Sequence, residues 1–252
     1  MARSFADELE DAFQTQRRRK VALSDRLRAI ADLVRERGPA FATAVDTFVG
    51  RLEVARAGDC APQVGEPMPL FIMPDQEGQL VALQDLLSDS PVVIVFHRGH
   101  WCPYCRLNMA ALAEIEERAK PARIVAVSSE VQRYTRELKA EAGGRFPILT
   151  DVGGGYALSL NLAVWVDQKM AGMIERAGWN IPLYQGGTAW ILPIPAVFVV
   201  RQDGVIAARH VDPDYRRRME VDDLLSCVDL VLDKAAAPVG RADEVKQRAR
   251  LA

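Results

Sequence analysis

Two cysteines, Cys102 and Cys105, stand in a Cys-x-x-Cys arrangement, a spacing that serves redox chemistry or metal binding. At the start of a helix this spacing lets two sulfurs approach across one turn, so that one thiol attacks and the other closes a disulfide. The chain has four cysteines, too few for the disulfide framework of a small secreted domain. We therefore expect redox chemistry at this pair, with Cys60 as a linker residue and Cys227 as a small apolar residue of the interior.

The residues around the pair predict a strand, a short loop and a helix. The β-branched segment 92–97 is typical of a buried central strand, and Pro103 suits the first turn of a helix. Free N–H groups and the positive end of the helix dipole gather at such a helix start and stabilise a thiolate. On this reasoning Cys102, at the very start of the helix, is the better nucleophile, and Cys105 lies one turn in.

Two histidines and an arginine lie close to the pair and leave other interpretations open. His97, His100 and the two cysteines fall within nine residues, but structural zinc usually draws its ligand pairs from separated segments, so we expect no metal. Arg98 and His100 either stabilise the thiolate and move its proton or face water as ordinary loop residues. We expect Trp101 to pack beside the site.

The rest of the chain alternates strand and helix patterns after a helical beginning. Apolar stripes at helical spacing cover 23–34 and 41–52, separated by Gly38-Pro39, and residues 57–69 are rich in proline and glycine, as in a linker. We predict strands at 70–73, 79–81, 123–128 and 146–149, and a hairpin of 196–201 with 205–210 around an Asp-Gly turn. We predict helices at 102–119, 131–142, 168–176 and 221–234, one helical turn at 156–161, and a loop at 180–187. Alternating elements of this kind predict a mixed sheet with helices on both faces.

The segment Phe96–Cys105 resembles the active-site segment of peroxiredoxin-like proteins of the alkyl hydroperoxide reductase and thiol-specific antioxidant (AhpC/TSA) family, in the thioredoxin-like superfamily. Further similarity lies in 71–83, in 91–96 and in Ile194–Val200 with Asp203-Gly204, so the resemblance extends from about residue 60 to 231. It implies an α/β, thioredoxin-like fold with a central mixed sheet flanked by helices. We expect an N-terminal helical extension at 1–58, a thioredoxin-like peroxiredoxin domain at 59–235 and a polar tail at 236–252.

The resemblance also implies a thiol-dependent peroxidase that reduces hydrogen peroxide or organic hydroperoxides through a dithiol/disulfide cycle. Cys102 and Cys105 would be catalytic, with Arg98, His100, Trp101 and Pro195 in support. An external dithiol such as thioredoxin, or glutaredoxin with glutathione, would reduce the enzyme, which needs no metal or organic cofactor. The resemblance also implies that the protein forms a homodimer or a larger homo-oligomer.

The sequence departs from the usual peroxiredoxin segment Pro-x-x-x-Thr-x-x-Cys. Aligned on Cys105, Arg98 stands at the proline position and Cys102 at the threonine position, and the usual arginine before the late strand is not evident. Pro195 instead resembles the cis-proline that faces the active site of thioredoxins, and this resemblance implies a cis Ile194–Pro195 bond. Alignment with peroxiredoxins thus makes Cys105 the attacking cysteine, whereas alignment with thioredoxins makes it Cys102. The helix-start argument favours Cys102.

Composition excludes other classes of protein. The formal net charge of −2 gives no basic excess for nucleic acid, and no stretch approaches the ~18 apolar residues of a spanning helix. Residues 1–20 show no secretory signal pattern, so we expect a cytoplasmic protein without membrane contact. Two alternatives to a peroxidase remain: a general thiol–disulfide oxidoreductase, and a zinc-binding or non-catalytic interaction protein.

Overall fold

The computed structural model describes residues 4–236, so almost all of the polar tail predicted at 236–252 lies outside the described residues. The helices are α1 Phe5–Arg17, α2 Leu23–Arg37, α3 Pro39–Val54, α4 Leu83–Leu87, α5 Pro103–Ile115, α6 Gln132–Ala142, α7 Gly155–Ser159, α8 Gln168–Arg176, α9 Ile181–Tyr184 and α10 Val221–Ala236, with a 3₁₀ turn at Val152–Gly154. The strands are β1 Ile72–Pro74, β2 Leu80–Ala82, β3 Val92–Phe96, β4 Arg123–Ser128, β5 Ile148–Thr150, β6 Ala163–Trp165, β7 Ile191–Pro193, β8 Ala196–Val200 and β9 Ile206–Val211.

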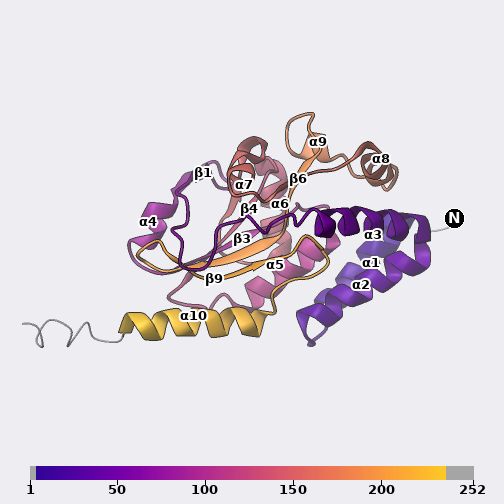
Figure 1. Cartoon of the computed structure of the whole chain (residues 1–252). Helices are drawn as coiled ribbons and strands as arrows, with labels where there is room; N and C mark the ends of the chain where they lie inside the picture. Colours follow the sequence, from indigo (N-terminus) through magenta and orange to yellow (C-terminus); the bar gives the residue numbers. More distant parts are fainter. Residues whose placement is uncertain (1–3, 237–252) are drawn as a thin grey trace, which may run out of the picture.

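A five-stranded mixed sheet forms the centre of the molecule, in the order β5-β4-β3-β8-β9 (Figure 1). Strands β3, β4 and β5 run parallel, whereas β8 and β9 are antiparallel to their neighbours. All five residues of β3 are buried, as its run of β-branched side chains predicts for a strand covered on both faces. The mixed sheet and the late hairpin confirm the predicted α/β fold.

The two faces of the sheet pack into separate apolar layers because side chains alternate along each strand. Ile94 and Phe96 pack with Phe71 and Leu83 on one face, while Val93 and Val95 pack on the other face with α5, α6 and α10. Helix α5, which carries the cysteine pair, therefore rests on the centre of the sheet.

Helices α1, α2 and α3 gather at one side of the sheet domain (Figure 1). Fully buried side chains on these helices include Phe13 and Ile30, and they share one apolar cluster with Trp101 of the preceding loop and with Tyr104 and other residues of α5. The predicted apolar stripes thus pack on the helix that carries the cysteines. The stripe at 41–52 also reaches α8, because residues of both helices belong to the same cluster.

Charged groups join the three N-terminal helices to the sheet domain. Arg106 of α5 donates hydrogen bonds to Glu10 of α1, at 2.6 Å, and to Glu141 of α6, and its guanidinium lies 3.8 Å from the Phe13 ring centre. Glu220 accepts hydrogen bonds at 3.0 and 2.7 Å from the backbone N–H groups of residues 23 and 24, which satisfies two free donors at the start of α2. These contacts hold the N-terminal helices to α5 and to the start of α10.

Two predictions about 180–195 are wrong. The expected loop at 180–187 contains α9, whose first turn is capped by the Asn180 side chain accepting from the Leu183 N–H at 3.1 Å. The Ile194–Pro195 bond is trans, and the cis peptide bond of the described residues is at Lys120–Pro121. The chain runs extended from β7 into β8, and the residue before a proline readily adopts that conformation.

Short elements with no clear period were missed by the sequence analysis. They are α4 and the small antiparallel pair of β6 with β7, whose β6 is labelled in Figure 1. Across residues 4–236, no helix is both long and apolar enough to cross a membrane.

Candidate active site

The cysteine pair lies where β3 ends and α5 begins. Cys102 is the N-cap of α5, with extended backbone angles, and Cys105 is the third residue of the helix, so its side chain lies one turn further along. Both thiols are free and buried, with exposed fractions of 1% for Cys102 and 0% for Cys105. The strand and the helix start are at the predicted places, and they bring the two sulfurs together.

Cys105 receives several groups that favour a thiolate. The backbone N–H of Arg98 donates to its Sγ at 3.3 Å, and the Arg218 guanidinium lies 3.6 Å from the same sulfur. Burial alone would raise the pKa of Cys105, but the hydrogen bond with the Cys102 thiol, the Arg218 charge and the Arg98 N–H lower it to about 5. These contacts favour the charged form of this sulfur.

Cys102 has the opposite environment. Its side chain takes no capping hydrogen bond from the start of α5. Burial raises the pKa of Cys102, and its hydrogen bond to the charged Cys105 raises it further, while Arg98 and Arg218 act against this rise. The surrounding groups thus favour the negative charge on Cys105 and the proton on Cys102, whereas the helix-start argument favoured Cys102 as the thiolate. The position of Cys102 at the start of α5 does not give its sulfur an N–H donor. The loop after β3, by contrast, gives the Arg98 N–H to the Cys105 sulfur.

Arg98 and Arg218 reach the site from segments far apart in the chain. The Arg98 guanidinium is buried and stacks on Tyr215, 3.8 Å from the ring centre, and lies 5.0 Å from the Trp101 ring centre. Tyr215 and Arg218 belong to the segment between β9 and α10. The sequence analysis missed Arg218; the run of three arginines at 216–218 between the last strand and the closing helix was the available signal.

His100 faces a buried carboxylate, and no hydrogen bond joins it to either sulfur. Its backbone N–H and its Nδ1 each lie 2.7 Å from oxygens of Glu130, and its ring stacks on Tyr134. Burial raises the pKa of Glu130, while the hydrogen bonds from His100 oppose the rise. The preceding Gly99 has a φ of +141°, and a Cβ at this position would lie 2.4 Å from Glu130 Oε1, so the close approach of loop and carboxylate needs a glycine. Glu130 thus fixes the loop whose next turn holds the cysteines.

His97 directly follows the central strand β3 and has no exposed surface, and neither of its ring nitrogens has a hydrogen-bond partner. Burial lowers the pKa of His97 to about 3, and the charges of Arg218 and His100 lower it in the same direction. His97 is therefore neutral in the folded protein at neutral pH. Pro195, the remaining expected site residue, is buried directly before β8, whose Ala196 pairs with Phe96 at the same end of the sheet.

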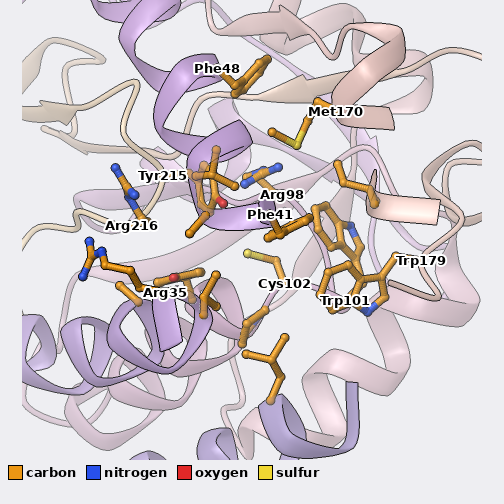
Figure 2. A pocket seen from close by; sticks show the side chains of 18 residues that line it. Arg35, Phe41, Phe48, Arg98, Trp101, Cys102, Met170, Trp179, Tyr215 and Arg216 are labelled. Carbon is orange, nitrogen blue, oxygen red and sulfur yellow. The ribbon is translucent and has the colours of Figure 1, made fainter. Parts of the chain in front are cut away.

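A pocket opens onto Cys102 between the sheet domain and the N-terminal helices. Figure 2 shows Cys102 near its centre, with Trp101 and Trp179 together on one side and Arg35 and Arg216 on the other. Cys102 lines this pocket and Cys105 does not. Cys102 is therefore the sulfur nearer the opening, and the charged Cys105 lies behind it.

The other candidate residues do not join this site. Cys60 is exposed, and Cys227 is half-buried on α10, with burial raising the pKa of its thiol. Over the part of the chain that the structure describes, no group of three or more histidine, cysteine, aspartate or glutamate side chains is arranged to hold a metal ion. The groups of this site that can react are therefore the paired thiols of Cys102 and Cys105.

Comparison with known proteins finds the AhpC/TSA family over residues 64–209. Among curated proteins, the chain is 22% identical over 161 residues to the thiol-disulfide oxidoreductase ResA of Bacillus thuringiensis and to that of Bacillus anthracis, covering 63% of this chain and 75% of each relative.

Solved structures of similar fold are peroxiredoxins. The peroxidoxin BcpB of Mycobacterium tuberculosis gives a TM-score of 0.50 at 20% identity, over 67% of this chain and 97% of that one. A peroxiredoxin 6 of Arenicola marina gives 0.54 at 18% identity, over 72% and 79%, and AhpC of Enterococcus faecalis gives 0.53 at 13% identity, over 71% and 98%. At these identities the likeness concerns the fold.

Proposed function

The chain belongs to the AhpC/TSA family, and from that premise we propose that it is a thiol-dependent peroxidase working through Cys102 and Cys105. One observation carries the proposal: the buried Cys105 sulfur accepts the Arg98 N–H at 3.3 Å and lies 3.6 Å from the Arg218 guanidinium, two contacts that favour a thiolate, and the Cys102 thiol is its hydrogen-bond partner. Attack on a peroxide needs a thiolate, and closure of a disulfide needs a second sulfur within reach.

In the first step the Cys105 thiolate attacks the terminal oxygen of the hydroperoxide. The O–O bond breaks, Cys105 becomes a sulfenic acid, and the electron pair leaves on an alkoxide or hydroxide. The Cys102 thiol is the nearest proton donor to this leaving group, which departs as an alcohol or as water. Arg98 and Arg218 stabilise the negative charge as it moves from sulfur to oxygen.

In the second step the Cys102 thiolate, left by the proton transfer, attacks the Cys105 sulfur. The S–O bond breaks, hydroxide leaves, and an intramolecular disulfide forms. Together the two steps convert one hydroperoxide and the thiol–thiolate pair into an alcohol, a disulfide and hydroxide, and the hydroxide takes up the proton that Cys105 released to solvent on ionising. An external dithiol of the thioredoxin type, or glutaredoxin with glutathione, then returns two electrons to the pair.

A general thiol–disulfide oxidoreductase is the second candidate. It is favoured by the position of Cys102 at the pocket and by the name of the two curated relatives. In that reaction the sulfur nearer the opening would attack a disulfide of a partner, and the buried Cys105 would release the partner by closing the internal disulfide.

The two functions differ in the oxidant that the reduced protein consumes. Reduced protein is mixed in a stopped-flow instrument with hydrogen peroxide, with an organic hydroperoxide and with a disulfide-bonded protein, and formation of the internal disulfide is followed. We expect the hydroperoxides to react at least tenfold faster than the protein disulfide. Faster reaction with the protein disulfide would favour the oxidoreductase, and the Cys105→Ser variant gives the background rate for each oxidant.

A further inference from the structure

Tyr215 lies on the segment between β9 and α10, outside the family match at 64–209, and its side chain is buried in the lining of the pocket at Cys102. Its ring centre lies 3.8 Å from Cζ of Arg98, and Figure 2 shows the two side chains next to each other. The ring also packs edge-on against Tyr104 of α5, with ring centres 5.5 Å apart. Tyr215 therefore joins the loop that follows β3 to the helix that carries the cysteines.

The Arg98 guanidinium needs a partner of this kind. The residue is 6% exposed, and among residues 4–236 no carboxylate forms an ion pair with it. A buried cation is costly unless other groups replace the water it has lost, and the face of an aromatic ring is one such group. The Tyr215 ring lies closer to the guanidinium than the Trp101 ring, whose centre is 5.0 Å away. Because the backbone N–H of Arg98 donates to Cys105 Sγ at 3.3 Å, a fixed side chain also fixes this donor.

The backbone of Tyr215 holds the second arginine of the site. One terminal nitrogen of the Arg218 guanidinium donates to the carbonyl oxygens of Tyr215 and Arg217, the latter at 2.6 Å. The other terminal nitrogen lies 3.6 Å from Cys105 Sγ. In the part of the chain that the structure describes, no carboxylate pairs with Arg218 either, so these carbonyls set the direction in which its guanidinium points.

Charged and titratable groups act on the Cys105 sulfur from several elements. Burial raises the pKa of Cys105, and the hydrogen bond with Cys102 at the start of α5 lowers it. Arg218 before α10 and Arg98 after β3 lower this pKa further. Burial and, less strongly, the charge of Cys105 raise the pKa of Glu130, which follows β4. Of these groups, the two arginines are the ones held by the ring and the carbonyl described above.

We propose that Tyr215 is a positioning residue for Cys105: its ring fixes Arg98 and its carbonyl fixes Arg218, so that the Arg98 N–H and the Arg218 guanidinium both reach the sulfur. As a statement about catalysis the inference rests on the proposed function, because that function uses the Cys105 thiolate. It gives a role to a segment outside the family match, and its tests need no peroxide.

The first test measures the pH profile of alkylation. Reduced full-length protein reacts with iodoacetamide between about pH 4 and pH 9, and mass spectrometry gives the rate at Cys105. Tyr215→Met removes the ring face while a flexible apolar chain fills much of its space, and Tyr215→Leu is a second variant without a ring. We expect both to move the midpoint of the profile upward by about one pH unit. We expect Tyr215→Phe, which keeps the ring, to stay within about 0.3 unit of the unmodified protein. Unshifted midpoints in the two variants without a ring would overturn the proposal.

Phe13→Met is the matched control for a general loosening of the structure. Phe13 is buried in the same apolar cluster as Tyr215, and its ring centre lies 3.8 Å from Cζ of Arg106, an arginine that makes no contact with either sulfur. The control therefore removes the same kind of ring from the same kind of contact. We expect its midpoint to equal that of the unmodified protein. An upward shift in Phe13→Met as large as that in Tyr215→Met would mean that lost packing alone causes the change, and the positioning role would be overturned.

The second test asks whether Tyr215 acts through Arg98. In an Arg98→Met background the ring has no guanidinium to hold, so Tyr215→Met should move the midpoint by less than half of its shift in the unmodified background. Equal shifts in the two backgrounds would show that the ring does not act through Arg98 and would overturn the proposal.

These tests are separate from the test of the proposed function. Shifted midpoints in a protein that reduces no peroxide would overturn the peroxidase function and leave Tyr215 as the residue that positions the two arginines. Reduction of peroxide by a protein whose midpoints do not shift would overturn the role of Tyr215 and leave the peroxidase function standing.

Discussion

The two sides of the cysteine pair are built from different parts of the chain and have different chemical character. We call the side that faces Cys105 the charged side, made of Arg98, Arg218 and the neighbouring His97. The apolar side faces Cys102 and is the pocket wall from α1, α2, α3 and α8. The charged side surrounds the sulfur whose pKa is lowered, whereas the apolar side covers the sulfur that lines the pocket.

The apolar side depends on the packing of the N-terminal helices. The largest expected effect is the loss of stability when a fully buried side chain of these helices is removed. Phe13 is fully buried on α1 beneath the Arg106 guanidinium. Phe13→Ala should lower the free energy of unfolding by about 3–5 kcal/mol, because it removes buried apolar surface and leaves a cavity. Urea unfolding measures this change, and Phe13→Leu is the conservative control. A loss below about 1 kcal/mol would show that these helices contribute little to stability.

The charged side contains a histidine that makes the protein sensitive to acid. The pKa of His97 is about 3 in the folded protein, below the value of about 6.5 expected for an unfolded chain. Between these values only the unfolded chain takes up the proton, so stability falls as the pH falls through this window. At pH 5 this histidine should cost about 2 kcal/mol relative to pH 8.

Replacing His97 separates this contribution from that of other acidic transitions. Urea unfolding at pH 8 and pH 5 should show that His97→Leu loses about 2 kcal/mol less than the unmodified protein on acidification. Equal losses in the two proteins would mean that His97 takes up its proton in the folded state, and the charged side would then be more open to water than its burial indicates.

Arg218 provides a third test, because its guanidinium lies 3.6 Å from the Cys105 sulfur. Arg218→Met should raise the pKa of Cys105 above its value of about 5, so the thiolate is lost at higher pH as the solution is acidified. The rate of alkylation by iodoacetamide at pH 5 should fall about tenfold. Arg217→Met is the matched control, since Arg217 is an exposed neighbour that pairs with carboxylates. Equal pH profiles for Arg218→Met and the unmodified protein would remove Arg218 from the charged side.

The smallest effect is expected at the two cysteines that belong to neither side. Cys60 is exposed and Cys227 is half-buried on α10. The double variant Cys60→Ser, Cys227→Ser should keep peroxide turnover within about twofold, because Cys102 already supplies the second sulfur. Loss of most turnover in a folded double variant would reveal a resolving cysteine outside the pair.

The sequence predicted the parts of the fold and site that depend on neighbouring residues. The β-branched run of β3 and Pro103 after Cys102 placed the strand, the loop and the helix start, because period and helix-start chemistry are local. The short strands β6 and β7 are three residues each and carry no period to detect.

The site was less predictable because its charges come from distant contacts. Arg218 reaches Cys105 across 113 residues of chain, and the N–H of Arg98 reaches the same sulfur because the loop after β3 folds back over α5. The helix-start argument considers only groups close in sequence and includes neither contact, so it assigned the thiolate to Cys102. Glu130, which fixes that loop through His100, is likewise joined to it only by the fold.

The central claim is that the Cys105 thiolate attacks the peroxide and that Cys102 resolves the product. Cys102→Ser and Cys105→Ser are made separately, each reduced protein receives one equivalent of hydroperoxide, and dimedone traps any sulfenic acid for mass spectrometry. The account predicts fast labelling of Cys105 in Cys102→Ser, where the serine hydroxyl can still donate a hydrogen bond, and slow labelling of Cys102 in Cys105→Ser. Fast labelling of Cys102 in Cys105→Ser, with slow labelling of Cys105 in the other variant, would contradict it.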